Sequence, residues 1–277
     1  MAFVHHKGGT GKTTACLQTA GWLCARHKRV LVVDTDPQAN ATLGLGVHPG
    51  TPAKNIYNVY QSAADPESEK TTLSDIIIRT GSGIDLVPAH LDLIGAEPLL
   101  YGCLDRYDIL TRQVAPLKER YDHILIDTPP FLGQFVLNGL MAADWTCAVF
   151  SPDWFAMNGY ENIRQIISDI EEILGKKIKL DIAVLNRWDC EETPGSIIDR
   201  LINHFRQKLI QEDRTTEDIK TILSEKIQAE FKKTIPVPSS WLIASSHRCG
   251  MPLAFTNPKD PAAVAFSFLA DCIENGI

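Results

Sequence analysis

A glycine-rich stretch near the start of the chain carries the residue types that bind phosphate. Residues 6–14 have the sequence His-Lys-Gly-Gly-Thr-Gly-Lys-Thr-Thr. Glycines let the backbone curl so that successive N–H groups point inward and hold an anion. Lys12 can reach the terminal phosphates, and the Thr13 hydroxyl can ligate Mg²⁺. The residues predicted to contact a bound polyphosphate are Gly8, Gly9, Thr10, Gly11, Lys12, Thr13 and Thr14.

The segments on either side of this stretch predict how it is held. Residues 1–4 are an apolar run that suits a buried strand, and residues 15–23 have the apolar spacing of a helix. A strand-to-helix turn places the helix N-terminus, with its partial positive charge, next to the anion. The stretch therefore has the geometry that a phosphate site requires.

The match to the general P-loop pattern is close but incomplete. That pattern has a glycine five residues before Gly11, where this chain has His6. A Rossmann dinucleotide turn is the alternative, but it needs Gly or Ala where the chain has Thr14, and it leaves Lys12 and Thr13 unexplained. We therefore interpret the stretch as a variant P-loop.

Two later apolar runs end in aspartate. Residues 30–33 lead into Asp34 and Asp36, and residues 124–126 lead into Asp127. The carboxyl ends of parallel strands meet at one edge of a sheet, where ligand sites of α/β proteins lie. Asp127 is predicted to hold Mg²⁺ through water, as the Walker B aspartate does. A solvated turn after the strand is the alternative for Asp34 and Asp36.

The spacing of these three motifs predicts the fold class. It favours an α/β protein with a doubly wound, mainly parallel sheet flanked by helices. At 277 residues the chain is long enough for one large domain, and we expect residues 1–277 to form a single domain. The charge-rich residues 195–233 are predicted to be helical and to elaborate this domain.

Composition excludes several classes of protein. Lys+Arg 27 against Asp+Glu 34 gives a net charge of −7, which argues against a strongly basic nucleic-acid binder, although totals do not show local patches. No apolar run approaches the ~20 residues that span a bilayer. The seven cysteines form no C-x-x-C pair and suit a reducing cytosol. We expect a cytoplasmic protein without a secretory leader.

Two stretches resemble one branch of the P-loop proteins. Lys7, ahead of the glycine pair, resembles the deviant Walker A lysine of the ParA/MinD ATPases, which reaches the partner subunit's nucleotide. Residues 33–42, Val-Asp-Thr-Asp-Pro-Gln-Ala-Asn-Ala-Thr, resemble the switch I segment of ParA/Soj partition ATPases. The resemblance implies that Asp36 positions the attacking water and that Asp34 holds magnesium-bound water.

The resemblance extends to two positions later in the chain. Residues 180–185 suit a strand that ends at Asn186, and in relatives a polar residue there recognises adenine. A helix cap is the alternative for an asparagine at this place. Residues 234–238, Thr-Ile-Pro-Val-Pro, resemble the family's Ile-Pro turn, whose backbone packs over adenine. Pro236 is the contact that this resemblance implies. The chain departs from the family after this turn, because it lacks the arginines that often follow it.

Taken together, the resemblance implies a slow ATPase that uses ATP and Mg²⁺ and dimerises with itself when ATP binds. Its catalytic residues would be Lys7, Lys12 and Asp36. A ParB-like centromere-binding protein would stimulate it, and the ATP dimer would bind DNA nonspecifically during plasmid or chromosome partition. The candidate DNA contacts are Arg187, Arg200, Arg206, Lys232, Lys233 and Arg248. The final predicted helix, residues 261–273, has no Lys or Arg, unlike the membrane anchor of MinD.

Three alternatives remain open at this point. The switch could position a protein assembly instead of DNA. The chain could be a metallochaperone or electron-transfer ATPase, which would require cysteines such as Cys103 and Cys147 to converge across a dimer axis. It could also be a nucleotide-binding interaction module without meaningful turnover.

Overall fold

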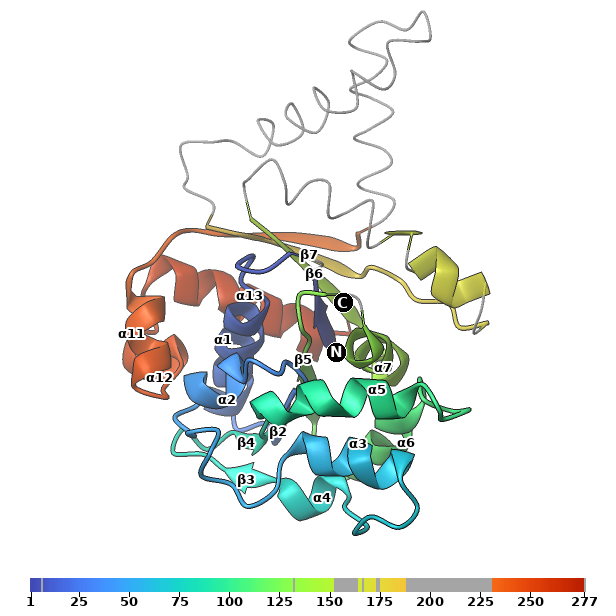
Figure 1. The fold of residues 1–277 in the computed structure, drawn as a ribbon. Helices are drawn as coiled ribbons and strands as arrows, with labels where there is room; N and C mark the ends of the chain where they lie inside the picture. The colour runs from blue at the N-terminus through green and yellow to red at the C-terminus, as the bar shows by residue number, and fades with distance from the viewer. Residues whose placement is uncertain are drawn as a thin grey trace, which may run out of the picture.

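A mainly parallel β-sheet forms the centre of the molecule (Figure 1). The computed structural model describes residues 1–5, 7–131, 133–151, 164–165, 167–172, 175–187 and 231–276. The strand order is β3-β4-β2-β5-β1-β6-β7-β8, and only the β3–β4 pair is antiparallel. The strands are β1 (Ala2–Val4), β2 (Val30–Asp34), β3 (Ile78–Arg79), β4 (Asp85–Val87), β5 (His123–Asp127), β6 (Thr146–Phe150), β7 (Ile182–Asn186) and β8 (Lys233–Val237).

The central strands are mostly apolar because both faces of the sheet are covered, and their polar residues lie at the strand ends. Every residue of β1, β2 and β6 is buried. Alternate residues of β2 point to opposite faces: Leu31 and Val33 belong to one hydrophobic cluster, and Val30 and Val32 belong to the other. Continuous apolar runs of this kind are typical of parallel strands between two helical layers.

Helices cover both faces of the sheet (Figure 1). One layer contains α1 and α13, with α2, α11 and α12 beside them, and the other contains α3, α5, α6 and α7. The bounds are α1 (Lys12–Ala25), α2 (Asn40–Gly44), α3 (Ile56–Ala64), α4 (Leu73–Ile76), η1 (Leu91–Gly95), α5 (Ala96–Leu100), α6 (Ile109–Val114), η2 (Ala115–Leu117), α7 (Gln134–Ala142), α11 (Leu242–Arg248), α12 (Leu253–Thr256) and α13 (Pro261–Glu274).

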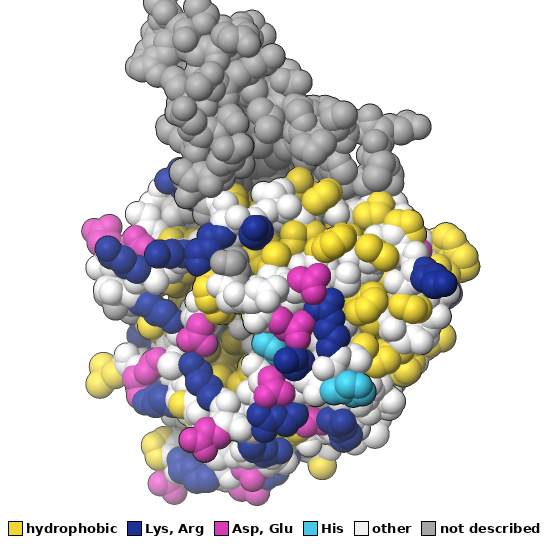
Figure 2. All heavy atoms as spheres, turned by 180° about the vertical axis from the view of Figure 1, so that it is seen from behind, with side chains coloured by type: hydrophobic (Ala, Val, Ile, Leu, Met, Phe, Trp, Pro, Cys, Tyr) yellow, Lys and Arg dark blue, Asp and Glu magenta, His cyan; other side chains and the backbone are white. Residues whose placement is uncertain are grey.

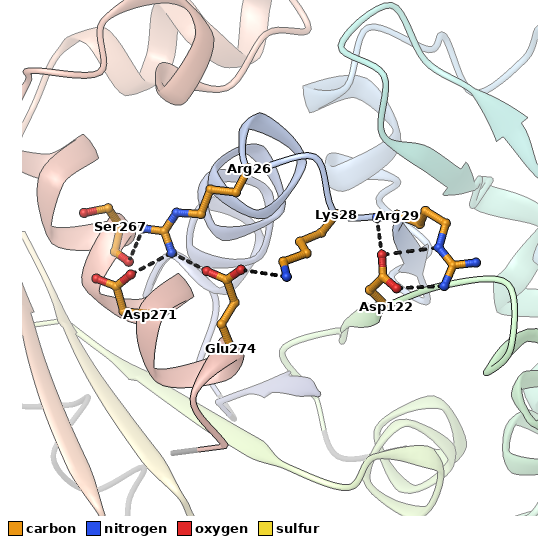
Figure 3. A network of polar contacts seen from close by, with 7 residues as sticks. All are labelled: Arg26, Lys28, Arg29, Asp122, Ser267, Asp271 and Glu274. Atoms are coloured by element: carbon orange, nitrogen blue, oxygen red, sulfur yellow. Dashed lines mark hydrogen bonds and ion pairs between the residues drawn. The ribbon is translucent and has the colours of Figure 1, made fainter.

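A polar network secures the C-terminal end of α1 (Figure 3). Arg26 forms an ion pair with Asp271 of α13 at 2.7 Å and donates to the Ser267 carbonyl at 3.2 Å. Lys28 pairs with Glu274 at 3.3 Å. Partly exposed ion pairs contribute little free energy, so we assign this network mainly a geometric role. It fixes the direction of α1, whose other end faces the glycine-rich loop.

The predicted fold class is confirmed. The sheet is doubly wound and mainly parallel, helices flank it on both faces, and the described residues form one domain. The predicted helical elaboration, residues 195–233, lies outside the described residues except for its last three, and so do Arg200 and Arg206. Among the helices that the structure describes, none has both the length and the apolar character to cross a membrane.

Candidate functional site

Three chain segments meet at the carboxyl edge of the sheet. The strand order places β5 between β2 and β1, so the segments that follow these strands are neighbours. Asp34 at the end of β2 is the register partner of Asp127 at the end of β5, and Phe3 of β1 also pairs with Asp127. The two acidic motifs and the glycine-rich loop therefore converge, as the sequence predicts.

The glycine-rich loop turns tightly from β1 into α1. Gly9 and Gly11 have φ angles of 79° and 100°, which residues with a Cβ atom rarely adopt. A Cβ atom on Gly11 would also lie 2.1 Å from Nδ2 of Asn186, so only glycine fits there. Helix α1 begins at Lys12, directly after the loop, and the predicted strand-to-helix turn is confirmed.

Lys12 lies inside the loop and not on the surface. Its side chain is 6% exposed, and Nζ donates to the Lys7 carbonyl oxygen at 3.4 Å. Burial lowers the pKa of Lys12, while the charges of Asp127 and Asp36 oppose that shift. The ammonium group is thus held among carboxylates at the place where the loop would bind an anion.

Asp127 and Thr13 are joined by a hydrogen bond. The Thr13 hydroxyl donates to Oδ2 of Asp127 at 2.7 Å. Asp127 is completely buried, and burial together with the nearby Asp34 charge raises the pKa of its carboxyl well above the ordinary value. Its second oxygen, Oδ1, is buried and makes no hydrogen bond in the described part of the protein.

This arrangement fits a hard divalent cation. Mg²⁺ prefers oxygen ligands and is usually bound through one or two carboxylates together with substrate phosphates and waters. The Thr13 hydroxyl and the buried Oδ1 of Asp127 supply such oxygens beside a loop that suits phosphate. The donor chemistry of the site therefore matches magnesium.

Asp34 and Asp36 occupy different positions in the segment after β2. Asp34 is completely buried, and burial raises the pKa of its carboxyl to about 7. It accepts hydrogen bonds from the Thr42 N–H at 2.8 Å, the Thr42 hydroxyl at 2.7 Å and the Asp36 N–H at 3.1 Å. Asp36 is 5% exposed and accepts a hydrogen bond from the Gln38 N–H at 2.8 Å. Burial raises the pKa of its carboxyl, although that hydrogen bond and the charge of Lys12 oppose the shift.

The two positions predicted to contact adenine differ in their surroundings. Asn186 ends β7, as predicted, and its Nδ2 donates to the Thr10 carbonyl oxygen at 2.8 Å. Pro236 was expected in a turn, and this expectation is wrong: it lies inside β8, opposite Leu185 in the register. Proline is tolerated there because β8 is the last strand of the sheet in the part of the chain that the structure describes, and no described strand needs its N–H as a donor on the outer side.

Two residues that shape the site were not identified from the sequence. His5 is buried, and its Nδ1 accepts a hydrogen bond from the Lys7 N–H at 3.0 Å while its ring meets Phe150 edge-on. Thr42 joins Asp34 to the loop after β4, because its hydroxyl also accepts from the Ala89 N–H at 3.0 Å. Thr42 ends the stretch 33–42, but no local pattern marks His5.

The cysteines considered for a metal site lie on different faces of the sheet. Cys147 is buried in β6 and belongs to the hydrophobic cluster under α1 and α13, where burial raises the pKa of its thiol. Cys103 follows α5 in the opposite layer and contacts the Leu99 carbonyl. The described residues contain no group of three or more His, Cys, Asp or Glu side chains placed to bind a metal ion.

Comparison with known proteins gives a consistent result over nearly the whole chain. Residues 1–182 match a family described as an AAA domain. The sporulation initiation inhibitor protein Soj of Bacillus subtilis is 31% identical over 272 residues, which cover 98% of this chain and 96% of that protein. The chromosome-partitioning ATPase Soj of Treponema pallidum is 29% identical over 272 residues, with 98% and 94% coverage.

A solved structure is similar as well. Cobyrinic acid a,c-diamide synthase from Mycobacterium smegmatis, crystallised with an ATP analogue and magnesium, superimposes with a TM-score of 0.72. The two sequences are 26% identical, and the match covers 99% of this chain and 93% of that one. Sequence and structure thus agree on the same group of nucleotide-binding proteins.

Proposed function

The chain belongs to the Soj/ParA family of P-loop ATPases, and we propose that it is an ATP-dependent dimerisation switch and ATPase that acts in the cytoplasm in plasmid or chromosome partition. The observation that carries this proposal is the Thr13–Asp127 hydrogen bond of 2.7 Å beside the buried Lys12. It brings together the residues that a magnesium-bound triphosphate requires. The names of the Soj relatives support partition as the process.

In this proposal the loop from Gly8 to Thr14 binds the triphosphate through its N–H groups. Lys12 offsets the negative charge of the phosphates, and its burial strengthens this interaction because the local dielectric constant is low. Thr13 and Asp127 would hold Mg²⁺, with Asp34 reaching it through water, and the ion would neutralise charge on the β- and γ-phosphates. The base would lie toward the ends of β7 and β8, where Asn186 and Pro236 are the predicted contacts.

Asp36 is the proposed residue for water. One of its oxygens is held by the Gln38 N–H, and its charge lies near Lys12. In hydrolysis the water oxygen forms a bond to the γ-phosphorus, and the bond from that phosphorus to the β–γ bridging oxygen breaks. The products are ADP and inorganic phosphate. Asp36 would orient the water and accept a hydrogen bond from it.

Lys7 is proposed to complete the site of a second copy of the chain. The surface beside the loop suits such contact, because Phe131 is 46% exposed and the preceding Pro130 lies against Gly8. Glu97 of α5 accepts a hydrogen bond from the Gln134 N–H at 3.0 Å, so α5 lies close to the segment that follows Phe131. Further exposed apolar residues lie on η1, on α5 and in the turn after α5. These residues are Leu91, Ile94, Leu99, Tyr101 and Leu104.

Replacing Lys7 with alanine should abolish the ATP-dependent dimer. Truncating one partner of a charge-assisted contact across an interface typically weakens association by about 30-fold or more. With ATP and Mg²⁺, light scattering coupled to size exclusion should show twice the monomer mass for the wild type and for the control Lys259→Ala, which alters an exposed lysine elsewhere. The Lys7→Ala variant should elute as a monomer. A wild type that stays monomeric with ATP would contradict the proposed sandwich.

Replacing Asp36 with asparagine should separate binding from hydrolysis. The variant keeps the shape of the side chain and loses the charge that orients water, so turnover should fall by at least about 100-fold while the ATP-dependent dimer persists. Phosphate release and particle mass measure the two properties separately. Asp144→Asn, which changes an exposed carboxylate before β6 at the opposite end of the strands, should retain wild-type turnover. Normal hydrolysis by Asp36→Asn would remove Asp36 from the mechanism.

The ATP dimer is further proposed to bind DNA nonspecifically and to be stimulated by a ParB-like partner. Figure 2 shows a row of Lys and Arg side chains over the segment that leads into β7 and over the start of β8. Lys232 of this row also pairs with Asp181 at 3.2 Å. Such a row supplies local positive charge despite the net charge of −7. Its exposed lysines are Lys177, Lys179, Lys232 and Lys233.

A gel-shift assay on random-sequence duplex DNA tests this surface. We expect a shift only with ATP, and its affinity should fall steeply as salt rises. The double variant Lys179→Ala/Lys233→Ala should reduce the slope of log affinity against log salt by about one to two, because each phosphate contact contributes about 0.9. Lys259→Ala should keep the wild-type slope. The absence of any shift at low salt with ATP would contradict DNA binding.

A further inference from the structure

The end of β7 holds the glycine-rich loop from outside. Nδ2 of Asn186 donates to the Thr10 carbonyl oxygen at 2.8 Å, and Nη2 of Arg187 donates to the Gly9 carbonyl oxygen at 2.8 Å. Two consecutive side chains therefore bind two consecutive carbonyls of the loop. Asn186 is 6% exposed, whereas Arg187 lies at the surface, so water competes more strongly for the arginine contact.

These two contacts determine where the next N–H groups of the loop point. No cis peptide bond occurs in the described chain, and in a trans peptide the carbonyl and the following N–H point in opposite directions. Fixing the carbonyls of Gly9 and Thr10 toward β7 therefore directs the N–H groups of Thr10 and Gly11 away from it. The sheet order places the carboxylates of β2 and β5 on that other side of β1.

The backbone at the end of β7 supports this arrangement. Arg187 has a φ angle of 59°, in the left-handed region that residues with a Cβ atom rarely occupy. A turn of this kind immediately after Asn186 lets both side chains reach the loop, although they alternate along an ordinary strand. A strained non-glycine residue that contacts a ligand-binding loop is a typical sign of a functional constraint.

We propose that Asn186 and Arg187 are positioning residues that preorganise the phosphate cradle before nucleotide binds. The inference rests on the proposed nucleotide-binding function of the loop. The amide nitrogen of Asn186 holds the loop backbone and thereby raises the affinity of the loop for phosphate, in addition to any contact that Asn186 makes with the base. Preorganised N–H groups bind an anion more tightly because less ordering is required at the moment of binding.

Inorganic tripolyphosphate distinguishes this role from recognition of the base, because it contains no base. Calorimetry with Mg²⁺ would compare tripolyphosphate, ATP and GTP on the full chain. Asn186→Ala should weaken tripolyphosphate binding by a factor of about 10, which corresponds to the loss of one buried hydrogen bond, and it should weaken ATP and GTP by at least that factor. The control Arg79→Ala, on the edge strand β3, should bind like the wild type.

Arg187 offers a matched series that separates the side chain from the backbone. Arg187→Gly relieves the unfavourable φ angle and removes the guanidinium group, so it should keep or raise the melting temperature and still weaken tripolyphosphate by about threefold. Arg187→Ala should lower both the melting temperature and the affinity for tripolyphosphate. Arg187→Lys should recover part of the tripolyphosphate affinity. Full tripolyphosphate affinity in Arg187→Gly would exclude Arg187 from the proposed role.

The outcomes also separate this inference from the proposed function. Unchanged tripolyphosphate affinity in Asn186→Ala, with weaker ATP and an altered ATP-to-GTP ratio, would overturn the cradle role and support a base contact. A wild type that binds neither tripolyphosphate nor ATP would refute the nucleotide-binding function itself. Melting curves of each variant show that the fold is intact, so a loss of affinity is not a loss of structure.

Discussion

Burial of four charged groups at one edge of the sheet is the constraint on which the site depends. Lys12, Asp34, Asp36 and Asp127 are all nearly or completely buried. Removing an unpaired charge from water costs several kcal/mol, so such groups persist only with partners or in neutral form. Here the lysine lies among the carboxylates, hydrogen bonds hold Asp34 and Asp36, and burial raises the pKa of all three acids. A bound cation and phosphate would complete this balance of charges.

The fold produces this constraint through simple geometry. Parallel strands deliver their carboxyl ends to one edge, and the register of β2 with β5 places Asp34 beside Asp127. The loop after β1 then brings Lys12 and Thr13 to the same edge at the start of α1. The network of Arg26 and Lys28 with α13 holds the far end of that helix. The positions of the reactive groups thus depend on the sheet register and on one well-anchored helix.

The parts of the site that sequence predicted are those encoded by local patterns. The loop from Gly8 to Thr14, the acidic strand ends and the mainly parallel sheet each depend on neighbouring residues and on hydrophobic periodicity. Contacts between distant segments were not predictable in this way. Asn186 and Arg187 meet the loop across 176 and 178 residues, and only the fold shows that their side chains bind its carbonyls.

Two further differences have physical causes. Pro236 was expected in a turn because the stretch around it resembles the family's Ile-Pro turn. It lies in a strand instead, and at the edge of the described sheet a missing N–H leaves no neighbouring strand without its hydrogen bond. His5 has an ordinary position at the end of an apolar run, and its role follows from burial against Phe150 and from the Lys7 N–H that it accepts. The secondary-structure propensities of single residues do not predict such tertiary contacts. These contacts nevertheless determine how the loop is oriented.

The central claim is that the loop and the buried Asp127 form one site for a magnesium-bound nucleotide. Its most direct test is calorimetric titration of ATP into the wild type and into Asp127→Asn, with excess Mg²⁺ and with EDTA. The account predicts that Mg²⁺ strongly increases the ATP affinity of the wild type, and that Asp127→Asn binds ATP equally well in EDTA but gains little from Mg²⁺. An undiminished magnesium effect in the variant, or none in the wild type, would contradict it.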